Sequence, residues 1–242
     1  MTLFENVVAE YDAARPSYPD GVFDALGPLP GLRVLEVGAG TGIATRQLLE
    51  RDAKVIALDA GPAMLQQAVV RTPALPAVLG DGASLPIRSA SVDLVCFAQS
   101  WHWLDRATRV AESRRVLTPG GRWAAWWTHA RPDEEPWFDP FWSAVEQACP
   151  GTDRTQRDTD WGVTVAGDGL FGAPQQINVA WVRQLTVDTW MTDWASHSRI
   201  AQLPDAARAA LLATLRSITE DAFPSGVMDV RCETWLWIAT AT

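Results

Sequence analysis

The chain has 242 residues, 48% of them hydrophobic and 20% charged, an ordinary globular composition that argues against a disordered protein. Its formal net charge of −9 disfavours nucleic acid as a partner, because an acidic surface does not attract a phosphate backbone. The three cysteines lie far apart without a C-x-x-C pair, so we expect no disulfide framework, no metal site and a cytoplasmic location. No stretch approaches the ~20 apolar residues of a membrane span, and residues 1–12 do not resemble a signal peptide, so no membrane partner is expected.

The first half of the chain alternates between short apolar runs and segments with helical spacing. The apolar runs predict five strands, at 32–40, 53–60, 76–82, 92–98 and 122–128. Helical spacing predicts three helices, at 41–52, 61–71 and 104–117, and "TPGG" (118–121) predicts a turn. Because strands that alternate with helices form a parallel sheet covered on both faces, we expect an α/β fold.

This alternation ends after Thr128. The remaining pattern predicts a helix at 137–151, a loop at 151–174, a strand at 175–186, helices at 187–200 and 204–222, and a last strand at 227–240. No linker divides the chain, so we expect a single domain over residues 1–242.

A glycine loop, "LEVGAGTG" (35–42), lies at the turn from the first strand to the first helix. Glycines at alternate positions allow a tight turn and let a ligand approach the backbone closely. The dinucleotide fingerprint G-x-G-x-x-G would place a glycine at position 43, where Ile43 stands, so the loop does not favour a nicotinamide cofactor.

Carboxylates end the next two predicted strands. Asp59 ends the second strand, where a carboxylate can accept hydrogen bonds from two ribose hydroxyls. Asp81 ends the third strand, where a carboxylate can accept from an exocyclic amine. No Lys or Arg stands with them to hold a phosphate, so the pattern favours a nucleoside ligand without phosphates.

Together these motifs resemble the class I S-adenosylmethionine-dependent methyltransferases. The resemblance covers residues 30–130 and rests on "LEVGAGTG", "ALDAGPAML", "GDGASLPIRSASVDLV" and "RVLTPGGRW". On "YDAARPSYP", "AQSWHWLD" and "LTVDTWMTDWASHSRIAQLP" the chain is similar to the type 11 small-molecule methyltransferases, near the trans-aconitate methyltransferase group. The resemblance implies a Rossmann-like, doubly wound seven-stranded sheet, mostly parallel with an antiparallel last strand. It also implies S-adenosylmethionine as cofactor.

The resemblance further implies which residues hold the cofactor. Residues 38–42 would pack against its methionine part, Asp59 would bind the ribose and Asp81 the adenine. Tyr11 and Arg15 lie in a segment that covers the methionine end, although a surface ion pair remains the alternative for Arg15. The cofactor-binding residues expected are Tyr11, Arg15, Glu36, Gly38, Ala39, Gly40, Gly42, Asp59, Ala60, Met64, Asp81, Gly82, Ala83, Phe97 and Gln99.

Aromatic side chains and two histidines follow the fourth and fifth predicted strands, in "FAQSWHWLD" (97–105) and "WWTHARP" (126–132). Ligands bind at the carboxyl ends of such strands, so these residues should converge near the transferable methyl group. Strand alternation puts Trp126 and Trp127 on opposite sides of the sheet, and one of the two tryptophans beside His102 should be core. The substrate walls expected are Trp101, Trp103, Trp127 and Phe138.

The acceptor decides whether a base is needed. A hydroxyl must lose its proton, which His102 or His129 could take as catalytic base, with a structural role as the alternative. A carboxylate needs only a cationic clamp, such as Arg131, Arg183 or Arg199.

We therefore expect methyl transfer to a small molecule, at a carboxylate or hydroxyl oxygen, by a monomer or homodimer. The alternatives are transfer to a nitrogen or carbon, and transfer to RNA or protein, which the acidity and "FAQS" in place of an "NPPY"-like tetrapeptide disfavour. A cofactor-binding protein without catalysis and a dehydrogenase remain further alternatives. The cofactor core should cover 30–128, with 129–174 and 187–222 as a lid and wall over the acceptor site.

Overall fold

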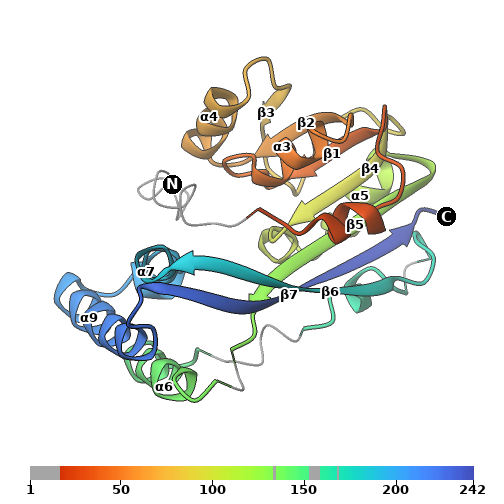
Figure 1. Ribbon diagram of the computed structural model, residues 1–242. Helices are drawn as coiled ribbons and strands as arrows, with labels where there is room; N and C mark the ends of the chain where they lie inside the picture. Colours follow the sequence, from red (N-terminus) through yellow and green to blue (C-terminus); the bar gives the residue numbers. More distant parts are fainter. Residues whose placement is uncertain (1–16, 133–134, 153–158, 168) are drawn as a thin grey trace.

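A computed structural model describes residues 17–132, 135–152, 159–167 and 169–242. Its centre is a seven-stranded sheet in the order β3-β2-β1-β4-β5-β7-β6 (Figure 1). The strands are β1 (Arg33–Val37), β2 (Lys54–Asp59), β3 (Ala77–Leu79), β4 (Val92–Ala98), β5 (Leu117–Ala130), β6 (Gln175–Thr186) and β7 (Val227–Thr240). β7 lies between β5 and β6 and runs antiparallel to both, while the other six strands share one direction, which confirms the expected mostly parallel sheet with an antiparallel last strand.

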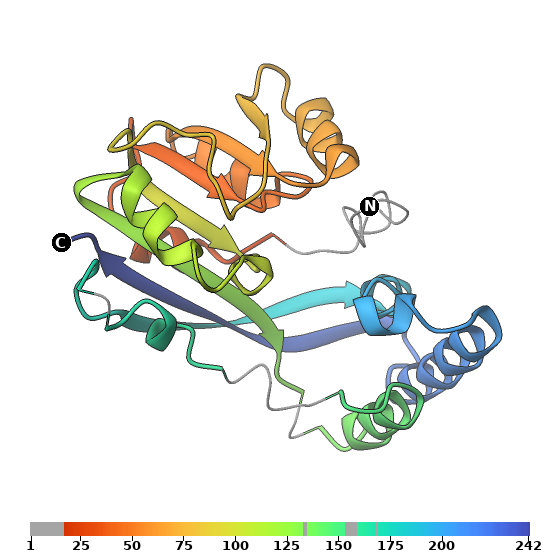
Figure 2. The same ribbon diagram turned by 180° about the vertical axis from the view of Figure 1, so that it is seen from behind.

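Helices cover both faces of the sheet, as Figures 1 and 2 show from opposite sides. The helices that precede β5 are α2 (Asp20–Ala25), α3 (Ile43–Leu49), α4 (Pro62–Arg71), the 3₁₀ helix η1 (Trp101–Trp103) and α5 (Arg109–Val116). Successive residues of β1 alternate between two cores: Val34 packs with α2 and α3, whereas Leu35 packs with α5 on the other face. Because both faces are buried, these strands are almost continuously apolar in sequence.

The long strands β6 and β7 extend beyond the parallel part of the sheet as a two-stranded ribbon (Figures 1 and 2). The helices at its far end are α6 (Phe138–Ala148), α7 (Val187–Ala195), α8 (Ser198–Ala201) and α9 (Asp205–Ala222), and the 3₁₀ helix η3 (Gly162–Thr164) precedes β6. A third core joins these four α-helices to the ribbon, with Phe141, Trp190 and Leu215 at its centre. None of the helices in the described ranges is long and apolar enough to cross a membrane.

Four local predictions differ from the structure. The sequence did not predict α2, which has only six residues. "TPGG" lies inside β5 rather than in a turn, but the pairing with β4 shifts there, because Val92 pairs with Leu117 while Leu94 pairs with Arg122. The helix expected at 104–117 begins only at Arg109. The helix expected at 187–200 is divided between α7 and α8, because the backbone of His197 is extended.

Candidate active site

A cavity of about 640 Å³ opens at the carboxyl ends of β1, β2, β3 and β4. We call it the first cavity. The expected cofactor residues that line it are Gly38, Gly40, Asp59, Ala60, Met64, Asp81, Gly82 and Gln99, and His102 and Trp103 line it as well. Residues that are distant in sequence thus meet at the sheet edge where an open α/β fold binds its ligands.

Asp59 connects the glycine loop to the tip of β2. The Gly40 N–H donates to Asp59 Oδ2 at 2.8 Å, and the Gly61 N–H donates to Oδ1 at 2.7 Å. Burial raises the pKa of Asp59, while these backbone hydrogen bonds act in the opposite direction. Gly40 adopts φ +58° and has open space where a Cβ would stand, so the loop leaves room for a ligand beside its backbone.

The glycine loop also touches the tip of β4. A Cβ on Gly38 would lie 2.4 Å from Cβ of Ser100, and the Ser100 hydroxyl donates to the Val37 carbonyl. The next residue back, Gln99, has φ +56°, a left-handed conformation that side-chain-bearing residues rarely adopt. Such strained backbone is concentrated at functional sites, and Gln99 lines the cavity.

Asp81 and its neighbours form the third wall. The Ala83 N–H donates to Asp81 Oδ1 at 2.9 Å, which closes a turn after β3. A Cβ on Gly82 would lie 2.6 Å from Cδ2 of Leu104, so only glycine lets this turn approach the segment after β4. Asp81 lines the first cavity together with Trp142 and Trp194 from the helices of the ribbon end.

A second cavity of about 770 Å³ adjoins the first and lies under α6 and α7. Expected residues in its wall are Trp127, His129 and Phe138. The residues that line both cavities are Gln99, His102, Trp142, Trp194 and His197. The site therefore has two adjoining chambers with His102 at their junction.

His102 is held by an aromatic surround. The Trp127 Nε1–H donates to His102 Nδ1 at 3.3 Å, and the imidazole lies 4.6 Å from the Trp103 ring and 6.0 Å from the Trp161 ring. His102 is solvent-accessible and lines both cavities, while its ring lies close to aromatic side chains. The partial loss of hydration there, together with the nearby charge of Arg109, lowers the pKa of His102 to about 4. The imidazole is therefore neutral at pH 7.

Arg109 contributes a buried positive charge to the second cavity. Its guanidinium donates to the Trp101 carbonyl at 3.0 Å and lies 4.6 Å from the centre of the Trp101 ring. Burial lowers its pKa, and among the described residues no carboxylate forms an ion pair with it. The charge of Asp105 acts on Arg109 from a distance without forming an ion pair, and a buried charge without a direct partner is costly, so this side chain suits contact with a ligand.

The three arginines expected as clamps lie in different places. Arg183 lines the second cavity but pairs with Asp193 at 3.0 Å. Arg199 lines the first cavity, and Arg131 lines neither cavity and pairs with Glu233 at 3.3 Å. Their charges are therefore not gathered at one point.

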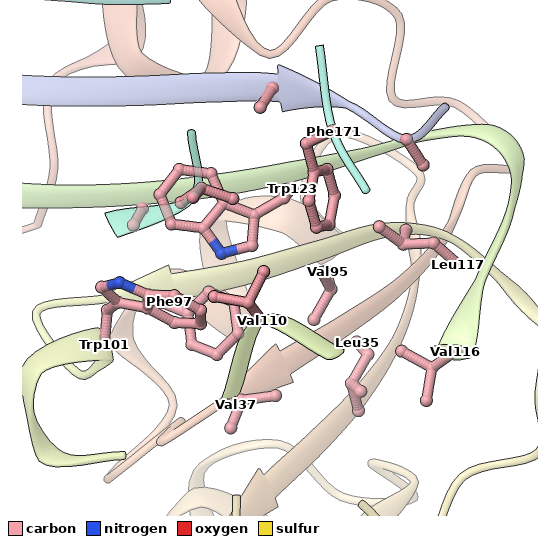
Figure 3. Close-up of a cluster of buried hydrophobic side chains, with 14 of the residues drawn as sticks. Leu35, Val37, Val95, Phe97, Trp101, Val110, Val116, Leu117, Trp123 and Phe171 are labelled. Carbon is pink, nitrogen blue, oxygen red and sulfur yellow. The ribbon is translucent and has the colours of Figure 1, made fainter. Parts of the chain in front are cut away.

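Trp101, expected in the substrate wall, and Phe97, expected to bind the cofactor, belong instead to the core (Figure 3). Trp101 and Phe97 are fully buried with ring centres 4.6 Å apart, and Trp123 lies 5.1 Å from Trp101. The Trp101 Nε1–H donates to Thr164 at 2.9 Å, so its polar edge is satisfied inside the protein. The turn η1 directs Trp101 inward and leaves Trp103 57% exposed, and this corrects the placement of Trp101 in the substrate wall.

Several other expected cofactor residues stand behind the wall. Glu36 is 1% exposed and accepts a hydrogen bond from the Thr45 hydroxyl. Burial, with a smaller effect of Asp59, raises its pKa to about 7. Ala39, Gly42 and Ala83 also line neither cavity. Tyr11 and Arg15 lie outside the described residues.

Sequence reasoning missed Arg109, Trp142, Trp194 and His197 as wall residues. The helix predicted at 137–151 has an apolar side that includes Trp142, and this pattern was the available signal for that residue. The other three depend on how the ribbon-end helices and α5 pack, which no local pattern encodes. The described residues contain no group of three or more His, Cys, Asp or Glu that could hold a metal ion.

Comparison with known proteins agrees with this geometry. Residues 35–125 match the family described as "Methyltransferase domain". An uncharacterized methyltransferase of Mycobacterium tuberculosis is 34% identical over 216 residues, covering 89% of this chain and 84% of the relative. An uncharacterized methyltransferase-like protein of Schizosaccharomyces pombe is 31% identical over 231 residues, covering 91% and 87%. A solved structure assigned to a type II methyltransferase of Anaeromyxobacter dehalogenans superposes with a TM-score of 0.66 at 25% identity, covering 94% of this chain and 97% of that one.

Proposed function

This chain belongs to the class I S-adenosylmethionine-dependent methyltransferases, and from that premise we propose that it methylates an oxygen atom, of a carboxylate or a hydroxyl, on a small molecule. The observation that supports a small acceptor is the second cavity, of about 770 Å³, which adjoins the first at Gln99 and His102. An acceptor in this chamber would lie beside the first cavity, because Gln99 and His102 belong to the walls of both.

The residues of the first cavity fit S-adenosylmethionine. Asp59 offers the remaining lone pairs of a carboxylate that the backbone already orients, which suits two ribose hydroxyls. Asp81 suits the exocyclic amine of adenine, and the open space beside Gly40 suits the methionine part. Arg199 is the one arginine or lysine in the described wall, which suits a ligand without phosphates.

The cofactor supplies an activated methyl group on a sulfonium centre. The residues of this chain align the acceptor with that methyl group and exclude water, the two requirements of a displacement at carbon. Trp103, Trp142 and Trp194 give the first cavity aromatic surfaces, which favour a sulfonium cation as they favour ammonium.

Membership of the type 11 small-molecule group, near the trans-aconitate methyltransferases, is the finer form of this proposal. It is supported by "AQSWHWLD", whose His102 and Trp103 lie in the cavity wall. We propose a monomer or homodimer that acts without nucleic acid. Transfer to RNA or protein, or to a nitrogen or carbon of a metabolite, is the alternative.

Calorimetry and a labelled-methyl assay test the proposal. We expect S-adenosylhomocysteine to bind and NAD not to bind. Tritiated S-adenosylmethionine, offered with a panel of carboxylic acids, alcohols and amines, should label an acid or an alcohol. Alkali releases methanol from a methyl ester but not from an ether, and this identifies the methylated oxygen. Failure to bind S-adenosylhomocysteine would refute the proposal, and label that enters only RNA, protein or amines would support the alternative.

A further inference from the structure

His102 stands where the two cavities meet, and one of its two ring nitrogens is already engaged. The Trp127 Nε1–H is a donor only, so its hydrogen bond of 3.3 Å requires a lone pair on His102 Nδ1. A neutral imidazole has one protonated nitrogen and one lone-pair nitrogen, and the bond made by one nitrogen sets the state of the other. The proton of His102 therefore resides on Nε2.

The surroundings also disfavour a second proton on this ring. Arg109, from α5, carries a positive charge into the same cavity without an ion-pair partner among the described residues. The rings of Trp103 and Trp161, with centres 4.6 and 6.0 Å from that of His102, cover part of the imidazole and reduce its contact with water. The charged side chains in the walls of the two chambers are Asp59, Asp81, Arg106, Arg109, Asp160, Arg183, Asp193 and Arg199, with the imidazoles of His129 and His197. Of these, Asp193 is matched by Arg183, and Asp59 by backbone amides.

We propose that Trp127 is a positioning residue that holds His102 in the tautomer protonated at Nε2, so that His102 serves the acceptor as a hydrogen-bond donor and not as a general base. The role in acceptor binding rests on the proposed function, whereas the tautomer itself does not. In this state the only lone pair of the ring is taken by Trp127, and removal of a proton from the acceptor would require that bond to break.

The consequence concerns the chemical form of the acceptor. An atom that meets His102 must accept a hydrogen bond, so it presents an oxygen lone pair at that point. Where it also meets Arg109, on which Asp105 acts only from a distance, a negative charge on the acceptor would form a direct ion pair. An acceptor that is already deprotonated when it binds can accept a hydrogen bond from His102 and pair with Arg109. An acceptor that still carries its proton would need a base other than His102.

Nitrogen-15 NMR of histidine-labelled protein tests the tautomer without any acceptor. The chain holds three histidines, and the His102→Gln variant assigns the signals of His102. At pH 7, with and without S-adenosylhomocysteine, we expect Nδ1 to resonate as an unprotonated, pyridine-like nitrogen and Nε2 as a protonated, pyrrole-like one. A proton on Nδ1, or on both nitrogens, would overturn the proposal.

Trp127→Phe separates positioning from packing. It removes the donor but keeps an aromatic ring, so His102 should lose the single-tautomer signature and give signals averaged between the two tautomers. Trp237→Phe is the matched control, because the Trp237 ring lies 5.8 Å from that of Trp127 and its Nε1 has no hydrogen-bond partner among the described residues. An unchanged His102 spectrum in Trp127→Phe would contradict the assignment. If that variant does not fold, the parent spectrum still decides.

Activity distinguishes donor from base, with the panel compound that the parent labels fastest. The side-chain amide of His102→Gln can donate from the Nε2 position but cannot act as a base. We expect this variant to keep turnover within about tenfold of the parent and His102→Ala to lose more. A loss of about a hundredfold or more in both variants would indicate a base and overturn the proposal, as would full activity in both. Failure to bind S-adenosylhomocysteine would instead refute the proposed function.

Discussion

At the scale of single residues, the buried side chain of Glu36 makes the stability of the protein depend on pH. Its pKa is raised from 4.5 to about 7, chiefly by burial, so the folded protein holds a proton there that the unfolded chain releases between these values. Stability is therefore lost as the pH rises from 4.5 through 7. Glu36→Gln keeps an oxygen that can accept from the Thr45 hydroxyl, but it has no proton to release. At pH 8 the free energy of unfolding of this variant should therefore exceed that of the parent by up to about 3 kcal/mol.

Thermal unfolding of the cofactor-free protein checks this expectation. Glu36→Gln should raise the midpoint above that of the parent at pH 8, and by much less at pH 5. Glu50→Gln, on the exposed end of α3, is the matched control and should change little at either pH. An equal effect of Glu36→Gln at both pH values would show that proton release is not the cause.

Asp59 is the residue from which we expect the largest effect on the cofactor. Asp59→Ala removes the ribose acceptors and also the two backbone hydrogen bonds that hold the glycine loop. A hydrogen bond to a charged group contributes ~1.5–3 kcal/mol, so S-adenosylhomocysteine should bind at least tenfold more weakly by calorimetry. Asp24→Ala, on the exposed face of α2, is the control. An affinity within twofold of the parent in a folded Asp59→Ala protein would contradict the ribose role.

From sequence alone, we expected a ligand site at the carboxyl ends of the strands, because parallel strands bring these ends to one edge of the sheet. Asp59, Asp81 and Gly40 follow that expectation and line the first cavity. That expectation could not choose between Trp101 and Trp103, since that choice depends on one turn of 3₁₀ helix. Nor could it find Arg109, because charged side chains are seldom buried and nothing local marks the exception.

At the scale of elements, two of the glycines in the glycine loop, Gly38 and Gly40, are required for different reasons. Gly38 and Gly40 both have positive φ, but a Cβ on Gly38 would strike Ser100 at 2.4 Å, whereas a Cβ on Gly40 would meet open space. Gly38→Ala should therefore destabilise the fold through a clash between β1 and β4. Gly40→Ala should carry only the backbone strain, about 1 kcal/mol, and should obstruct the cofactor.

Urea unfolding and S-adenosylhomocysteine titration separate the two effects. Gly31→Ala is the control for strain alone, because Gly31 has φ +75°, open space and no place in either cavity. We expect Gly40→Ala to match it in stability and to bind the ligand more weakly. Equal stability of Gly38→Ala and Gly31→Ala would show that Ser100 yields without cost.

Element types followed the hydrophobic period closely, and each of the seven strands overlaps a predicted one, although β5 begins five residues before the predicted start. Boundaries were less predictable. The start of α5 depends on η1, which forms because Trp101 turns into the core, and the break before α8 depends on the packing of Trp194 and Ile200 in the third core. The glycines of "TPGG" mark an irregularity, but the sequence does not distinguish a turn from a shift in strand pairing.

At the scale of the whole molecule, we expect α6, α7 and α8 to respond to ligand as a lid. Trp142 and Trp194 line both cavities from α6 and α7, so a bound cofactor contacts the helices it must hold in place. Hydrogen exchange in residues 138–148 and 187–201 should slow when S-adenosylhomocysteine binds. Residues 175–180 of β6, which line neither cavity, are the internal control. Protection of 138–148 equal to that of β4 without ligand, and unchanged by it, would refute a lid.

The β6–β7 ribbon pairs twelve residues of each strand and holds the helices that roof the second cavity. The floor of the first cavity comes instead from β1 to β4 and the loops that follow them. Some side chains of α6 and α7 face both cavities, as Trp142 and Trp194 do, whereas Phe138 and Trp190 line the second cavity alone. We therefore expect substitutions at Phe138 or Trp190 to change the choice of acceptor while leaving the affinity for the cofactor nearly as it is.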